Sequence, residues 1–206
     1  MQQERDFDPI TSDIVIWHAY DREVKADLYS TWLLAAGGGY LIDPIALQEP
    51  ALEKLISFAP VAGIIVTNSN HHRFAAPYAQ RFAVTIFAHA DTFSNDHPSR
   101  LKTVFNGDEI CDGLRVIGIA GAAPGEIALH YPINGGTLII GDALINFEPC
   151  GFTFLPPKYC TNQKQMRASL RKLLDYKPKR ILFAHGSPIL AAAGERLQGL
   201  LDGRSG

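Results

Sequence analysis

The sequence predicts an α/β (α+β) fold built as a four-layer αββα sandwich, with two sheets packed face to face between two layers of helices. Each half of the chain contains short runs rich in β-branched and aromatic residues, and each half also contains helical patterns that follow such runs. The chain has 206 residues, of which 47% are hydrophobic, so it is long enough to bury a core of this kind. It shows no repeat and no linker, and we therefore expect one domain over residues 1–206.

The first half of the chain predicts a hairpin followed by alternating helices and strands. Strands are expected over 13–19, 28–36, 40–43, 63–67 and 83–88. The triplet Gly37, Gly38 and Gly39 favours a tight turn between the second and third of these strands. Helices are expected over 50–58 and from about 73 to 81.

The second half predicts a group of short strands, many of them divided by Gly-containing turns. Strands are expected over 104–110, 114–119, 127–131, 137–140 and 180–183. Helices are expected over 161–174, with Thr161 as the N-cap, and over 189–201. The proline-broken stretch 147–159 is expected to be a packed loop near the site, with a lid or a dimer contact as the alternatives.

Charge and composition exclude several classes of partner. Lys and Arg number 19 against 21 Asp and Glu, so we expect no nucleic acid and no membrane partner. The N-terminus lacks the apolar segment of a signal peptide, and no run approaches about 18 apolar residues, so a cytoplasmic location is expected. The cysteines Cys111, Cys150 and Cys160 form no CxxC pair, which argues against a disulfide framework or a thiolate zinc site.

Polar residues follow three of the predicted strands. The stretch 68–73 follows the strand over 63–67, Asp142 follows the strand over 137–140, and His185 follows the strand over 180–183. Loops at strand ends often carry binding and catalytic residues. We therefore expect these turns to form one polar site.

The order of these segments resembles the metallo-β-lactamase superfamily from about Val15 to Leu201. The resemblance rests on YLIDP at 40–44, IIVTNSNHHR at 64–73, GAAPGEIALH at 121–130, LIIGDALI at 138–145 and ILFAHGSP at 181–188. It implies the αββα sandwich of that family. It also implies a hydrolase in which one or two metal ions, usually zinc, hold the water that cleaves lactams, thioesters, lactones or phosphoesters.

The resemblance further implies that most of the metal ligands are replaced. The family motif THxHxDH reads TNSNHHR at 67–73. Asn68 and Asn70 therefore stand at two histidine positions, His72 stands at the aspartate, and Arg73 stands at the last histidine. An amide oxygen is a poor substitute for imidazole on zinc, so this motif alone weakens the first metal position.

The remaining family positions complete this picture. Ala122 stands where the GHTPG-like turn has a histidine, while Asp142 and His185 match the bridging aspartate and the final histidine. The first metal position should therefore bind no transition metal, and no cofactor is expected. Arg73 cannot act as a ligand, but it can neutralise Asp142 through a charge-assisted hydrogen bond.

The candidate site residues fall into two groups. The expected catalytic residues are His72, Asp142 and His185. The expected substrate-binding residues are Asn68, Asn70, His71, Arg73, Glu126 and His130. The alternative is a zinc or iron ion held by His72, Asp142 and His185, because two imidazoles and a carboxylate form the ligand set of facial-triad iron enzymes.

Glu126 and His130 offer a further possibility. Residues four apart in a strand share a face, so this pair could act as a metal-free general acid and base, or Glu126 could reach the vacated metal position. A surface carboxylate beside a half-buried histidine is the structural alternative.

The predicted function is that of a hydrolase-like protein of unassigned substrate without dinuclear zinc chemistry. One alternative is a hydrolase or oxygenase-like enzyme with one metal ion held by His72, Asp142 and His185. The other is a non-catalytic protein that binds a small polar or anionic molecule or a protein partner. A homodimer is possible.

Overall fold

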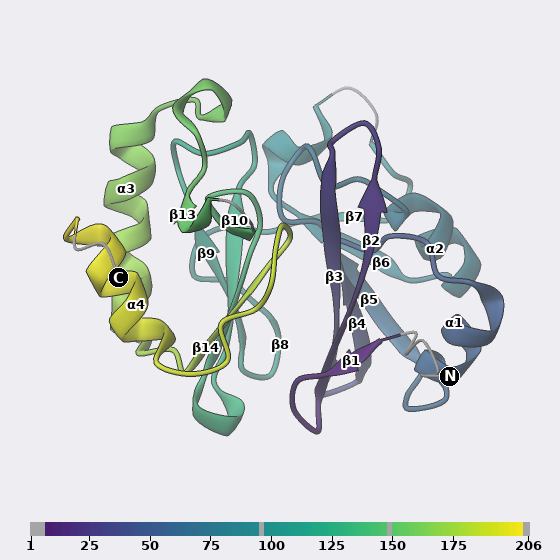
Figure 1. Ribbon diagram of the computed structural model, residues 1–206. Helices are drawn as coiled ribbons and strands as arrows, with labels where there is room; N and C mark the ends of the chain where they lie inside the picture. Colours follow the sequence, from purple (N-terminus) through teal and green to yellow (C-terminus); the bar gives the residue numbers. More distant parts are fainter. Residues whose placement is uncertain (1–6, 95–96, 148–149, 204–206) are drawn as a thin grey trace.

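Figure 1 shows the computed structural model, which describes residues 7–94, 97–147 and 150–203. Two sheets pack against each other at the centre. Helices α1 (Glu49–Ile56) and α2 (Ala75–Phe82) cover the outer face of one sheet. Helices α3 (Gln163–Arg171) and α4 (Ala193–Leu201) cover the outer face of the other sheet, which gives the four layers αββα.

The first sheet contains seven strands in chain order. They are β1 (Asp8–Pro9), β2 (Ile14–Asp21), β3 (Ala26–Ala35), β4 (Gly38–Ile42), β5 (Val61–Ile65), β6 (Thr85–Ala88) and β7 (Leu101–Thr103). Strands β1 to β4 pair antiparallel, whereas β4 to β7 pair parallel. The predicted glycine hairpin is confirmed, because Gly37 and Gly38 have φ angles of 92° and 134° where β3 turns into β4.

The second sheet has the order β14-β11-β10-β9-β8. Its strands are β8 (Glu109–Cys111), β9 (Leu114–Gly118), β10 (Ile127–Tyr131), β11 (Thr137–Ile140) and β14 (Arg180–Phe183). Strands β11 and β14 are parallel, so both end at the same edge of the sheet. A separate hairpin consists of β12 (Leu144–Phe147) and β13 (Gly151–Phe154).

Several predicted boundaries are wrong, including the three that follow. Asn162 rather than Thr161 caps α3, because its side chain accepts a hydrogen bond from the backbone of Gln165. Helix α4 begins four residues later than predicted, because Ile189 pairs with Ile181 of β14. The strand predicted over 104–110 is reduced to β8, and β7 ends before it begins.

Short 3-10 helices connect the longer elements. They are η1 (Ala90–Phe93), η2 (Ile133–Gly135), η3 (Pro157–Tyr159) and η4 (Lys172–Tyr176). The stretch 147–159 contains β13 and η3, and its residues 148 and 149 lie outside the described residues. Within the described part of the chain, no helix has the length and apolar character needed to cross a membrane.

The core consists of three apolar layers, one at each boundary between neighbouring layers of the αββα sandwich. Ile65 and Leu129 meet between the sheets. Leu52 belongs to the layer under α1 and α2, and Leu170 belongs to the layer under α3 and α4. Because these layers fix the strands, they also fix where the strands end and where their polar turns meet.

Candidate functional site

Three side chains from three different strand ends meet at one edge of the sandwich. His71 follows β5, Asp142 follows β11 and His185 follows β14. The Nε2 atom of His71 lies 3.1 Å from Oδ1 of Asp142 and 3.3 Å from Nε2 of His185. The Nε2 atom of His185 lies 3.2 Å from the same Oδ1. We call these three atoms the His-Asp-His triangle.

The His-Asp-His triangle has the dimensions of one face of a tetrahedral metal site. Ligands bound to zinc at 2.0–2.1 Å lie about 3.3 Å from one another. Two imidazoles and one carboxylate are donors that suit zinc or iron(II). All three donor atoms lie within 4.8 Å of one another, so these residues fit one metal ion.

The second nitrogen of His71 is also held. Its Nδ1 lies 3.0 Å from Oδ2 of Asp43 and 2.9 Å from Oγ1 of Thr67. Thr67 in turn donates hydrogen bonds to Asp43 from its hydroxyl group at 2.6 Å and from its backbone N–H at 2.8 Å. Metal-ligating histidines are commonly oriented by a carboxylate in this way. The arrangement fixes both the rotation and the tautomer of the His71 ring.

The electrostatics of the site centre on His71. Burial disfavours a charge on this ring, but the carboxylates of Asp43 and Asp142 outweigh burial and raise the pKa of His71 to about 9. Burial also opposes ionisation of Asp142, yet the charge of His71 and hydrogen bonds from His185 and His71 hold the pKa of Asp142 well below 3.8. Without a metal ion, the imidazolium of His71 therefore neutralises this carboxylate.

The structure corrects the prediction for His72. This side chain is exposed, its Nε2 donates to the carbonyl oxygen of Thr92 at 2.6 Å, and its ring stacks on Phe93 with centroids 4.2 Å apart. Adjacent residues of a turn point in different directions, so only one of the two histidines reaches Asp142. His71 occupies the place in the triangle that the sequence prediction gave to His72.

The predicted hydrogen bond from Arg73 to Asp142 is also wrong. Within the described residues, the guanidinium of Arg73 donates only to backbone carbonyl oxygens: Tyr29 at 2.6 Å, Asp43 at 2.9 Å and Ala184 at 3.3 Å. Asp142 still interacts with the charge of Arg73 at longer range. Arg73 therefore connects β3, the turn after β4 and the turn after β14.

The residues predicted to stand at the first metal position of the family are bound to carboxyl groups or offer no donor. Asn70 donates from Nδ2 to Oδ2 of Asp142 at 2.8 Å, and Asn68 donates from Nδ2 to Oε2 of Glu126 at 2.6 Å. Ala122 is fully buried and offers no ligand atom. Burial and the charge of Asp142 raise the pKa of Glu126 to about 8. Two amide groups and a buried carboxyl group thus lie together here, and none of Asn68, Asn70 and Ala122 carries an imidazole.

The structure separates Glu126 from His130. Glu126 precedes β10 and lies in a turn, so the strand alternation that would pair it with His130 does not apply. The ring of His130 packs on Tyr176 with centroids 4.6 Å apart, and its Nε2 has no hydrogen-bond partner among the described residues. The predicted acid–base pair is not formed, whereas Glu126 does reach Asn68.

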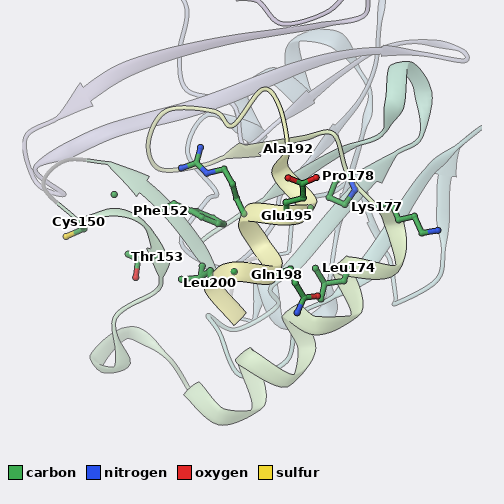
Figure 2. A pocket seen from close by; sticks show the side chains of 14 residues that line it. Cys150, Phe152, Thr153, Leu174, Lys177, Pro178, Ala192, Glu195, Gln198 and Leu200 are labelled. Atoms are coloured by element: carbon green, nitrogen blue, oxygen red, sulfur yellow. The ribbon is translucent and has the colours of Figure 1, made fainter. Parts of the chain in front are cut away.

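A groove of about 1340 Å³ lies apart from the His-Asp-His triangle (Figure 2). Its walls come from β13, η4 and α4, and Figure 2 labels Phe152, Leu200, Glu195 and Gln198 among the residues that line it. No residue of the triangle lines this groove. The groove and the triangle are therefore separate features of the structure.

Fold and site together define an αββα sandwich with metal-ligand residue types at the strand ends. The chain belongs to the metallo-β-lactamase superfamily, since the family model described as Metallo-beta-lactamase superfamily matches residues 10–203. This confirms the predicted fold class and resemblance. None of the curated proteins compared with the chain matches it.

Several solved structures share the fold. The crystal structure of the DIM-1 metallo-β-lactamase has a TM-score of 0.75 at 14% identity and covers 97% of each chain. A metallo-β-lactamase from Pontibacter korlensis has a TM-score of 0.70 at 17% identity, over 93% of this chain and 98% of that one. The FIM-1 metallo-β-lactamase from Pseudomonas aeruginosa, solved in a mono-zinc form, has a TM-score of 0.72 at 13% identity, over 96% of this chain and 93% of that one. At these identities the comparison shows the fold alone.

Proposed function

We propose that this chain is a hydrolase that holds one divalent transition-metal ion, most readily zinc, between His71, Asp142 and His185. The observation that carries this proposal is the His-Asp-His triangle, whose donor atoms lie 3.1, 3.2 and 3.3 Å apart. The replaced residues at the other metal position argue against dinuclear zinc chemistry.

The surrounding residues prepare the three ligands. Asp43 and Thr67 orient the ring of His71, and Asn70 holds the second oxygen of Asp142. A metal ion bound here would supply a Lewis acid that polarises a carbonyl or phosphoryl oxygen and increases the acidity of water. We therefore propose as substrate a small polar or anionic molecule with a hydrolysable acyl or phosphoryl bond.

A second candidate function is metal-free binding of such a molecule. It is favoured by the hydrogen-bond distances within the triangle, because a protonated His71 satisfies Asp142 without an ion. The two candidates differ in metal content, which makes them separable by experiment.

The test measures metal in protein purified without chelator, followed by titration of the apoprotein with cobalt(II). We expect about one equivalent in the wild type and its loss in His71→Ala and His185→Ala. His72→Ala is the matched control and should keep the metal, because His72 bonds to Thr92 instead. A wild type that binds no stoichiometric ion, or a His72→Ala variant that loses it while His71→Ala does not, contradicts the proposal.

Activity is measured on the same variants with p-nitrophenyl esters, a thioester, a chromogenic β-lactam and bis-p-nitrophenyl phosphate. Any activity found should decrease at least about 100-fold in His185→Ala, since a ligand is lost, and remain in His72→Ala. Activity that survives both chelation and His185→Ala would exclude the proposed centre.

A further inference from the structure

A closed ring of hydrogen bonds begins and ends at the turn that carries Asp142. The Oδ2 atom of Asp142, which lies outside the triangle, accepts a hydrogen bond from Nδ2 of Asn70 at 2.8 Å. The backbone N–H of Asn70 donates to Oδ1 of Asn68 at 2.8 Å, and Nδ2 of Asn68 donates to Oε2 of Glu126 at 2.6 Å. The backbone N–H of Ala143 donates to Oε1 of Glu126 at 3.0 Å. Since Ala143 follows Asp142 in the chain, the ring closes.

The ring is packed tightly as well as hydrogen-bonded. Asn68 and Glu126 are 0% and 5% exposed, so each unmet polar atom would carry a desolvation cost. A Cβ atom at position 141 would lie 2.6 Å from Oγ1 of Thr67, 2.8 Å from Oε1 of Glu126 and 2.9 Å from Nδ2 of Asn68. Only glycine at position 141 leaves these side chains where they are. Backbone and side chains therefore specify one arrangement of the ring.

We propose that Glu126 is a positioning residue that, through Asn68 and Asn70, fixes the Asp142 carboxylate so that its Oδ1 stays in the His-Asp-His triangle. This inference rests on the proposed function. Without the ring, the carboxylate could rotate and present either oxygen or both. With the ring, Nδ2 of Asn70 donates a hydrogen bond to Oδ2 of Asp142. The buried carboxyl group of Glu126 holds Asn68, which in turn holds Asn70. The ring thus does for Asp142 what a second metal ion would do for a bridging carboxylate.

The direction of each hydrogen bond provides a specific test. Glu126→Gln leaves one acceptor for two donors, so its NH₂ group faces either Nδ2 of Asn68 or the backbone N–H of Ala143. Asn68 cannot flip to relieve this, because its oxygen accepts from Asn70. Asn68→Asp replaces the Nδ2 donor by a carboxylate oxygen, so the two facing carboxyl groups keep a hydrogen bond only by holding a proton between them. The double variant restores the bond between positions 68 and 126 with donor and acceptor exchanged, since the new amide at 126 donates to the new carboxylate at 68. The bonds from the backbone N–H groups of Asn70 and Ala143 keep their direction. Its formal charge equals that of the wild type.

Two readouts are compared across the four proteins: the urea midpoint of chelator-treated protein, and the affinity and visible spectrum of bound cobalt(II). Each single variant should lower the midpoint and weaken cobalt binding by about 10- to 100-fold, the usual effect of losing a residue that orients a ligand. The double variant should recover most of both losses. Glu53→Gln, at an exposed glutamate of α1, should change neither.

Asn70→Ala provides a variant that does not depend on buried changes. Asn70 is exposed, so this protein should fold, yet it loses the last link to Asp142. Cobalt binding should weaken by the same factor and the cobalt spectrum should change. Wild-type affinity and spectrum in Asn70→Ala, or a double variant no better than its worse parent, overturns the inference.

Failure of the proposed function gives a different pattern. If the wild type binds no cobalt but the double variant recovers the urea midpoint of the single variants, the ring exists and the metal site does not. If the wild type binds cobalt and Glu126→Gln binds it equally well, the metal site stands and the positioning role of Glu126 is wrong.

Discussion

At the scale of single residues, His71 is fixed through both ring nitrogens. Its Nε2 faces Asp142 and His185, while its Nδ1 faces Asp43 and Thr67. A ring held from both sides keeps its lone pair aimed at one point, which is the preorganisation that a metal ligand needs. The same contacts explain why a buried imidazole can carry a charge when no metal is bound.

Asp43→Asn tests the support of His71. The substitution keeps the size of the side chain, and asparagine tolerates the φ of 47° at this position, but the carboxylate that orients Nδ1 is lost. We expect cobalt affinity to decrease by about 10- to 100-fold. The measurement is a competitive cobalt titration, with the exposed Asp27→Asn as the control. Unchanged affinity in Asp43→Asn would show that the ring is positioned by packing alone.

Residue types at the site could be predicted from the sequence, whereas their directions could not. Asp142 and His185 follow strands with clear apolar patterns, so their place was predictable. His71 and His72 are adjacent, and only the backbone of the turn decides which side chain faces the strand ends. The direction of the Arg73 side chain also depends on the backbone of the turn. Its φ is 38°, and its guanidinium donates to backbone carbonyl groups.

At the scale of elements, Arg73 connects the two sheets at the edge where the site lies. It bonds to Tyr29 within β3 of the first sheet and to Ala184 after β14 of the second. Its third acceptor is the carbonyl of Asp43, whose side chain supports His71. The guanidinium of Arg73 thus fixes two segments: the one that carries His185 and the one that carries Asp43, which orients the ring of His71.

Arg73→Lys tests this connection while keeping the charge. Lysine lacks the planar fork that reaches three carbonyl groups, so at least one acceptor loses its partner. We expect the free energy of unfolding to fall by roughly 1.5–3 kcal/mol, the value of a hydrogen bond to a charged group. Urea unfolding measures this change, with the substitution Arg100→Lys at an exposed arginine as the control. Equal unfolding curves for the wild type and Arg73→Lys would mean that the positive charge at position 73, and not its three hydrogen bonds, provides the stability.

The predicted elements were most accurate where an apolar run ends at a turn signal. Strands β10, β11 and β14 have the predicted bounds, since glycine, proline or charged residues flank each of them. The start of α4 could not be predicted, because Ile189 looks helical by spacing, but the chain turns back after β14 and pairs Ile189 with Ile181. Such strand pairing overrides the helical spacing of the sequence.

At the scale of the whole molecule, three apolar layers hold the sheets and leave one polar network where the strands end. That network contains acidic groups with opposite behaviour. Asp142 has a pKa well below 3.8, whereas the pKa of Glu126 is raised to about 8, mainly by burial and then by the charge of Asp142. The stability of the metal-free protein should therefore depend on pH in a way that one residue can reveal.

The sign of this dependence follows from proton linkage. An unfolded glutamate has a pKa of 4.5, so the folded protein binds the proton of Glu126 more tightly. Its contribution to stability is complete below about pH 4.5 and is lost as the pH rises through about 8. Other groups, including His71, titrate in a similar range, so the wild type must be compared with a variant that lacks the ionisable group at position 126.

Glu126→Gln makes that comparison. Urea midpoints of chelator-treated wild type should fall between about pH 5 and pH 8, and those of Glu126→Gln should fall less, because its amide takes up no proton on folding. The Glu126→Gln variant starts from a lower urea midpoint, since the ring is broken. The comparison therefore uses the change of the midpoint with pH and not its absolute value. Glu53→Gln should run parallel to the wild type. Parallel slopes for wild type and Glu126→Gln would mean that Glu126 ionises as it does in the unfolded chain, and that burial beside Asp142 does not govern its proton.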